Sequence, residues 1–141
     1  MKKFLSVLTL GLFLFTSSAI AEDKKGLNVI LTAKDAQTQM MAMVLSMTTI
    51  KQKKAVNMTL CADAGDLAVK GKESTLLKPK NKSPKMMLQA LIKSGAKVEV
   101  CPLYLPNANL DKSVLIEGVS VAKPQNVVKD LLNSDFTTLS Y

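Results

Sequence analysis

The stretch Ala96-Lys97-Val98-Glu99-Val100-Cys101-Pro102 decides the fold. Its apolar and charged residues alternate as in a β-strand with one buried face, and Pro102, which has no amide hydrogen to donate, ends the strand. Cys101 therefore stands at the carboxyl end of a strand. In open α/β sheets, ligands and chemistry collect outside the carboxyl ends of the strands. Since the chain has no histidine and only one other cysteine, Cys61, this sequence favours sulfur chemistry.

A helix with clear start and stop signals precedes this strand. Ser83 is a good N-cap, Pro84 occupies the first helical position and Gly95 stops the helix. An earlier helix begins after Asp35, an N-capping residue, and runs to about Lys54. The spacing of apolar residues predicts a buried side for each helix: Met87, Leu88, Leu91 and Ile92 on one, and Met40, Met43, Val44, Met47 and Ile50 on the other.

Strands and helices alternate along the rest of the chain. Apolar, β-branched runs predict strands at residues 27–32, 55–61 and 136–141, and a short one within 114–121. Pro124 opens a last helix, whose inward residues are predicted to be Val127, Val128, Leu131 and Leu132. This order predicts an α/β fold, a three-layer α/β/α sandwich with a five-stranded, mainly parallel sheet. We expect one domain, residues 22–141.

The N-terminus has the features of a secretory signal peptide, predicted to span residues 1–21. Lys2 and Lys3 precede an apolar core from Phe4 to Phe15, and Ala19-Ile20-Ala21 forms a cleavage site. We therefore expect a periplasmic protein. The sequence after the signal peptide has no second long apolar segment, so no integral membrane segment is expected in the mature chain. Cleavage lowers the net charge from +8 to +6. Every basic residue is lysine, and nucleic-acid readers favour arginine, so we expect no nucleic-acid partner.

The sequence resembles the DsrE/DsrF-like family, which includes the TusD sulfur carriers. The resemblance covers most of the mature chain and is strongest at Val98-Glu99-Val100-Cys101, at Gly118-Val119-Ser120-Val121 and at residues 136–141. It implies that Cys101 accepts a persulfide after the third strand. It also implies a trimer or hexamer, a sulfur donor or acceptor protein as partner, and neighbouring second and third strands that place Cys61 near Cys101. This chain would be an exported member.

The candidate site residues follow from this placement. Cys101 is the candidate persulfide or thiol residue, and Cys61 is either a resolving thiol or its disulfide partner. The loop after Cys101 supplies candidate ligand-binding residues, which are Pro102, Leu103, Tyr104 and Asn107. Without histidine, a Cys-His nucleophile is excluded. Asp63 and Asp66 have the spacing of an ordinary turn and receive no catalytic role.

Three functions remain open at this point. The first is a sulfur carrier or thiol-redox protein acting through Cys101, rather than a turnover enzyme. The second is a non-catalytic, oligomeric module that binds a ligand or partner and contains a Cys61–Cys101 disulfide. The third is Cu(I) binding by methionine and cysteine sulfurs, with Met40, Met43, Met47 and Met58 as thioethers. Methionines at core spacing are more often packing residues, so we predict no metal site and no cofactor.

Overall fold

The computed structural model describes residues 23–141, so the predicted signal peptide and Glu22 lie outside the described residues. Five parallel strands form one sheet in the order β4-β3-β2-β1-β5. The elements are β1 (Gly26–Leu31), α1 (Ala36–Lys51), β2 (Ala55–Leu60), the 3-10 helix η1 (Ala62–Ala68), α2 (Pro84–Lys93), β3 (Lys97–Val100), α3 (Tyr104–Asn107), the 3-10 helix η2 (Lys112–Val114), β4 (Val119–Val121), α4 (Pro124–Leu131) and β5 (Phe136–Ser140).

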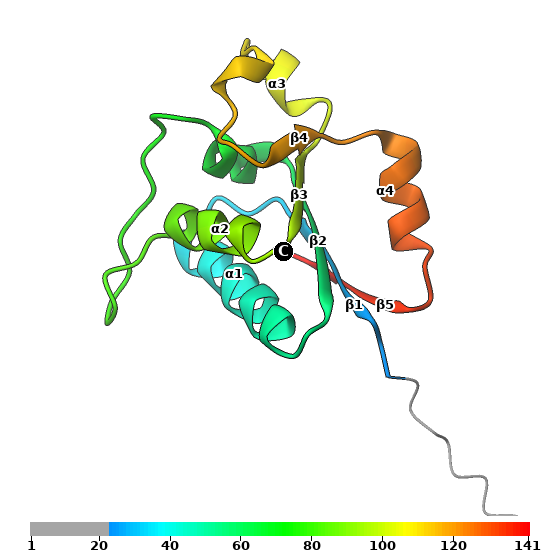
Figure 1. Cartoon of the computed structure of the whole chain (residues 1–141). Coiled ribbons are helices and arrows are strands. Elements are labelled where there is room, and N and C mark those ends of the chain that lie inside the picture. The colour runs from blue at the N-terminus through cyan, green and yellow to red at the C-terminus, as the bar shows by residue number, and fades with distance from the viewer. Residues whose placement is uncertain (1–22) are drawn as a thin grey trace, which may run out of the picture.

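The sheet lies between two layers of helices, as Figure 1 shows: α1 and α2 on one side and α4 on the other. The connections explain this arrangement. The chain steps from β1 to β2 to β3 in one direction, whereas the step from β4 to β5 returns across the sheet. Right-handed crossovers place the helices of opposite steps on opposite faces. The predicted three-layer α/β/α fold with a five-stranded sheet is confirmed, and the sheet is parallel throughout.

The core lies between the sheet and the layer of α1 and α2. Alternate residues of the three central strands point into it and are almost fully buried: Val29, Leu31, Val56, Met58, Leu60, Val98 and Val100. The predicted caps of both helices are confirmed. The Asp35 side chain accepts a hydrogen bond from the Thr38 amide at 2.8 Å, and the Ser83 hydroxyl accepts one from the Met86 amide at 3.2 Å.

The buried face of α1 differs from the predicted one. Gln39, Ala42, Met43 and Ser46 are buried, whereas Val44 is 43% exposed. Apolar residues occur around most of this helix, so spacing alone did not select the face that packs. The helix also ends at Lys51 rather than near Lys54, because Lys53 has a positive φ of 60° that a continuing helix does not allow.

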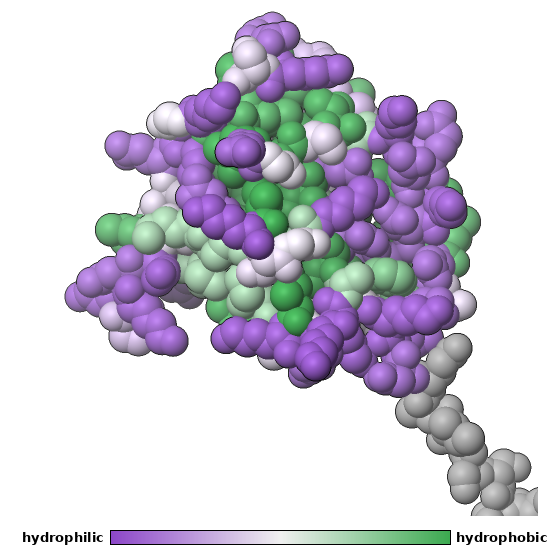
Figure 2. Space-filling view, in the orientation of Figure 1, coloured by the Kyte–Doolittle hydropathy of each residue, from purple (hydrophilic) through white to green (hydrophobic). Residues whose placement is uncertain are grey.

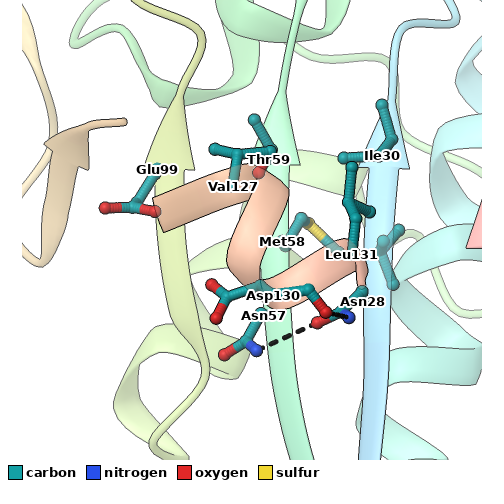
Figure 3. A pocket seen from close by; sticks show the side chains of 10 residues that line it. Asn28, Ile30, Asn57, Met58, Thr59, Glu99, Val127, Asp130 and Leu131 are labelled. Carbon is teal, nitrogen blue, oxygen red and sulfur yellow. Dashed lines mark hydrogen bonds between the residues drawn. The ribbon is translucent and has the colours of Figure 1, made fainter. Parts of the chain in front are cut away.

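The inward face of α4 is narrower than predicted. Val127 and Leu131 face the sheet beside Asp130 (Figure 3), whereas Val128 is 53% exposed and Leu132 is 80% exposed. A helix of two turns presents only one member of each adjacent apolar pair to the sheet. The prediction that Val128 and Leu132 point inward is therefore wrong.

Ser46 gives a prediction about stability. Its hydroxyl oxygen is buried on α1 and is the one buried side-chain polar atom within residues 23–141 that has no hydrogen-bond partner. An unsatisfied buried hydroxyl destabilises the folded state by about 1–3 kcal/mol. We expect Ser46→Ala to raise the free energy of unfolding by about 1 kcal/mol in urea denaturation. A decrease of similar size would show that this hydroxyl is satisfied in solution.

Within residues 23–141, no helix is both long enough and apolar enough to cross a membrane.

Candidate functional site: a pair of cysteines at the carboxyl edge of the sheet

Both cysteines lie at the carboxyl ends of neighbouring strands. Cys61 directly follows β2 and Cys101 directly follows β3. Leu60 pairs with Val100 in the parallel register of these strands, so the next positions, Cys61 and Cys101, face each other across the sheet. The Cys101 amide donates a hydrogen bond to the Leu60 carbonyl at 2.8 Å, which continues the ladder as far as the cysteine.

The two side chains are half-buried free thiols in contact with each other. Burial raises the pKa of the Cys61 thiol to about 11, and a hydrogen bond and the charge of Cys101 act in the same direction. At neutral pH, Cys61 is therefore a protonated neighbour of Cys101. A negative charge on Cys101 would oppose a second one on Cys61.

Cys101 lines an open groove of about 590 Å³ beyond the ends of β2 and β3, between the start of η1 and α3. Figure 1 shows α3 above the carboxyl end of β3. The other lining residues come from the segment after β2, from the loop at residue 72 and from α3 with its flanks: Ala62, Asp63, Asp66, Lys72, Leu103, Tyr104, Asn107 and Ala108. Cys61 does not line the groove, so a molecule in the groove meets Cys101 first.

One wall of the groove is held by a polar contact between α3 and η1. The Tyr104 hydroxyl donates a hydrogen bond of 2.6 Å to Asp66 Oδ1, and Lys72 Nζ lies 3.2 Å from Asp66 Oδ2. Burial opposes ionisation of Asp66, but the hydrogen bonds from Tyr104 and Lys72 outweigh it and lower the pKa of this carboxyl. Burial and the Asp66 carboxylate both raise the pKa of Tyr104. The groove therefore carries a fixed tyrosine–carboxylate–ammonium chain beside the thiol.

The local backbone also positions this wall. A Cβ atom on Gly65 would lie 2.4 Å from Tyr104 Cδ2, so only glycine lets the aromatic ring pack against η1. Ala62, directly after Cys61, has a positive φ of 47°. A left-handed backbone conformation costs a residue that has a Cβ about 1–2 kcal/mol. At Ala62 this conformation turns the chain sharply from β2 into η1.

We predict that Tyr104→Phe lowers the free energy of unfolding by about 1 kcal/mol near neutral pH. A hydrogen bond to a charged group contributes about 1.5–3 kcal/mol, and the exposure of Asp66 places this bond below that range. The folded-state pKa of Asp66 is lowered from 3.8, so its contribution is complete above that pH and is lost as the pH falls through the folded-state value. The contribution of Tyr104, whose pKa is raised from 10.0, is complete below pH 10.0 and is lost as the pH rises.

Urea unfolding of both proteins at several pH values measures this effect. The difference between wild type and Tyr104→Phe should stay constant between about pH 5 and pH 8 and shrink in stronger acid. A difference that does not change with pH down to about pH 2 would contradict a role for the Asp66 carboxylate.

The structure brings most of the predicted site residues together. Leu103, Tyr104 and Asn107 line the groove with Cys101, whereas Pro102 does not. Leu103 is 68% exposed, and Tyr104 is buried with its hydroxyl on Asp66. The Asn107 side chain donates a hydrogen bond of 2.7 Å to the Leu103 carbonyl, within the turn of α3. The predicted loop after Cys101 contains this short helix.

Sequence reasoning missed the part that Asp63, Asp66 and Lys72 play in the groove. It treated the two aspartates as turn residues and gave Lys72 no role. Tyr104 and Asp66 are separated by 38 positions, and no local pattern connects them. The one available signal was Gly65 beside two acids directly after a strand-end cysteine.

The methionines divide between core and surface. Met43 and Met58 are buried in the core, where their sulfurs serve packing, while Met40 lines a separate apolar groove. The methionines of the alternative Cu(I) hypothesis, Met40, Met43, Met47 and Met58, therefore do not converge on one open site. No group of three or more His, Cys, Asp or Glu side chains suited to a metal ion lies within the described part of the chain.

A second cavity lies under α4 and is too small for a ligand. Figure 3 shows Val127, Asp130 and Leu131 pointing from α4 toward the sheet. The Asn28 side chain donates to the Asp130 carbonyl, and the Asn57 side chain donates to Asn28 Oδ1 at 3.0 Å. The space that remains is about 10 Å³, near the minimum for one water molecule. This region joins a helix to a polar sheet face.

Fold and site together define a parallel α/β sandwich with two adjacent thiols at the carboxyl edge of its sheet. Two solved structures share this fold. The ychN protein from E. coli superposes with a TM-score of 0.68 at 16% identity, over 84% of this chain and 99% of that protein. MTH1491 from Methanobacterium thermoautotrophicum, described as a protein of unknown function, gives a TM-score of 0.61 at 12% identity, over 84% of this chain and 100% of that protein. These likenesses concern the fold alone, and they agree with the α/β architecture that the sequence resemblance implied. No family model and no curated protein matches the sequence.

Proposed function

We propose that the chain is a DsrE-like sulfur-handling protein in which Cys101 accepts sulfane sulfur as a persulfide. The observation that carries the proposal is the thiol pair itself. Two cysteines meet at the carboxyl edge of the sheet, and one of them lines an open groove of about 590 Å³. The fold shared with the two solved structures supports this reading at the level of architecture only.

The transfer needs only groups that the groove contains and a persulfide donor. The Cys101 thiolate attacks the outer sulfur of the donor persulfide, and a bond forms between that sulfur and Cys101 Sγ. The donor S–S bond breaks, and its electron pair leaves on the donor thiolate. The product is a persulfide on Cys101 and a free thiol on the donor. The step exchanges one sulfur–sulfur bond for another, so no external oxidant is required.

The charges of the groove select the kind of donor. Asp66 is paired with Lys72 and Tyr104, whereas Asp63 brings a further negative charge to the lining. A dianion such as thiosulfate would be repelled, since like charges in a partly enclosed groove disfavour binding. We expect a donor that carries an ammonium group, such as cysteine persulfide or a persulfide on a partner protein.

Intact mass spectrometry of anaerobically reduced protein tests this proposal. After exposure to cysteine persulfide and removal of the donor, the Cys61→Ser variant should be one sulfur atom heavier. The Cys61→Ser/Cys101→Ser double variant is the matched control and should gain nothing. An equal gain in mass in both variants, or no gain in mass in either, would contradict the persulfide proposal.

We further propose export to the periplasm, supported by the predicted signal peptide. Cell fractionation should recover a shortened chain that begins at Glu22. Recovery of the full-length chain from the cytoplasm would contradict this proposal.

We also propose that the chain forms the trimer or hexamer suggested by the resemblance, through the outer face of α1. Exposed apolar side chains gather there and on the segment beside it: Met41, Val44, Leu45, Leu76 and Met86. Met40, Val44 and Leu77 line two adjoining apolar grooves along this face. Figure 2 shows apolar surface bordered by hydrophilic side chains on the side that carries α1 and α2. An exposed apolar patch rimmed by polar side chains commonly marks a protein–protein interaction site.

Sedimentation velocity measures this assembly. Val44→Lys should shift the wild-type oligomer to monomer, since a lysine would be buried without a partner in the interface. Gln125→Lys places the same charge on an exposed position of α4 and should leave the oligomer intact. A wild-type chain that sediments as a monomer would contradict the proposal.

A further inference from the structure

The two thiols have unequal access to the groove. Cys101 lines it, whereas Cys61 stands beside Cys101 at the end of the adjacent strand and is not part of the lining. A simple sulfur carrier needs only the accessible thiol. The second thiol stands in contact with the sulfur atom to which a delivered persulfide would be attached.

We propose, on the basis of the persulfide function proposed above, that Cys61 discharges the Cys101 persulfide as hydrogen sulfide and forms a Cys61–Cys101 disulfide. The chain would then reduce sulfane sulfur to sulfide rather than pass it on intact. The substrate of this reaction is a persulfide donor. A thiol reductant must afterwards reduce the Cys61–Cys101 disulfide back to two thiols.

The atoms and electrons of this step balance. Cys61 Sγ attacks Cys101 Sγ, and a new bond forms between the two. The bond from Cys101 Sγ to the terminal sulfur breaks, and its electron pair leaves with that sulfur. The proton of Cys61 passes to the leaving sulfur, which departs as hydrosulfide. The two cysteine sulfurs are oxidised by two electrons in total, and the sulfane sulfur is reduced by the same two.

The backbone geometry suits this disulfide without rearrangement. Adjacent strands lie about 4.8 Å apart, and disulfides join Cα atoms about 4.4–6.8 Å apart. Both cysteines are held by the sheet: the Cys61 amide donates to the Leu31 carbonyl and the Cys101 amide to the Leu60 carbonyl, each at 2.8 Å. The attacking sulfur therefore starts in position, and little conformational entropy is lost on approach.

The proton needed by the leaving sulfur is also in place. The raised pKa of Cys61 keeps this thiol protonated at neutral pH, and the thiol already hydrogen-bonds Cys101. A high-pKa thiol is also a strong nucleophile once its proton has moved, because intrinsic nucleophilicity rises with basicity. Cys61 thus supplies both the proton for the leaving sulfur and the sulfur atom that attacks Cys101.

The test compares wild type with Cys61→Ser and Cys61→Ala under anaerobic conditions, each given cysteine persulfide. Sulfide is trapped and quantified, with the Cys101→Ser background subtracted, and each chain is alkylated and weighed. Wild type should release about one sulfide per chain and end two hydrogens lighter, with no alkylated thiol. Both Cys61 variants should retain the added sulfur and release at least tenfold less sulfide in the same time.

The outcomes separate the two proposals. If wild type and the Cys61 variants all retain the added sulfur equally, the discharge inference is overturned and the persulfide function stands. If the Cys61 variants take up no sulfur, the persulfide function itself is lost, and the inference fails with it. A cooperative urea unfolding transition in both Cys61→Ser and Cys61→Ala excludes a folding defect, and a donor-free sample excludes oxidation by residual oxygen.

Discussion

Gly65→Ala should displace the Tyr104 ring from η1 and lower the free energy of unfolding by about 1–3 kcal/mol, the usual effect of overpacking. The added methyl group would lie 2.4–2.6 Å from three atoms of the ring, closer than any stable contact. Tyr104 is buried and belongs to the core cluster, so the ring cannot move without disturbing its neighbours. The hydrogen bond from its hydroxyl to Asp66 would be lost at the same time.

A double-mutant cycle with Tyr104→Leu checks this explanation by urea denaturation. Without the ring, the methyl group meets no obstacle there, and Gly65→Ala should have less than half of its effect in the Tyr104→Leu background. An equal loss in both backgrounds would mean that Gly65 matters for backbone conformation rather than for the contact with Tyr104.

Leu60→Ala should cause the second large loss, about 2–5 kcal/mol. Leu60 is completely buried, and its removal leaves a cavity in the core at the end of β2, one residue before Cys61. Leu132→Ala is the matched control: the same chemical change at a residue that is 80% exposed should alter the free energy of unfolding by no more than about 0.5 kcal/mol. A loss below about 1 kcal/mol for Leu60→Ala would contradict the assignment of this side chain to the core.

Features encoded over short distances could be predicted from the sequence. The alternation from Lys97 to Val100 marks β3, because one face of that strand is buried and the other meets polar residues. Ser83 and Pro84 mark the start of α2, because an N-cap and a proline at the first position solve a local hydrogen-bonding problem. The order of such elements was enough to define the three layers and to place both cysteines at the carboxyl edge.

Features that depend on which surfaces meet could not be predicted. Val44 and Val128 have apolar side chains at helical spacing, yet both are exposed, because each helix offers more apolar surface than its contact with the sheet uses. The face that packs is decided by tertiary contacts such as the Asn28 side chain on the Asp130 carbonyl. Periodicity carries no information about such a contact.

The candidate site shows the same division. The strand-end position of Cys101 follows from its neighbours in sequence, and the groove residues after it follow from their proximity along the chain. The hydrogen bond between Tyr104 and Asp66 joins α3 to η1 across the fold, so neither residue indicates the other. The proximity of Cys61 and Cys101 depends on the register between β2 and β3, which exists only once these two strands have paired.

The position of β1 within the sheet has a consequence for how the molecule is made. β1 has β2 on one side and β5 on the other, and the Lys25 amide beside it bonds to the Asp135 carbonyl near the far end of the chain. While the chain folds, the outer edge of β1 keeps unpaired amide and carbonyl groups until β5, the last strand, pairs with it. An apolar strand with an open edge readily pairs with other chains. A partly folded chain in which β5 has not yet paired is therefore prone to aggregate, and a holding chaperone would protect it.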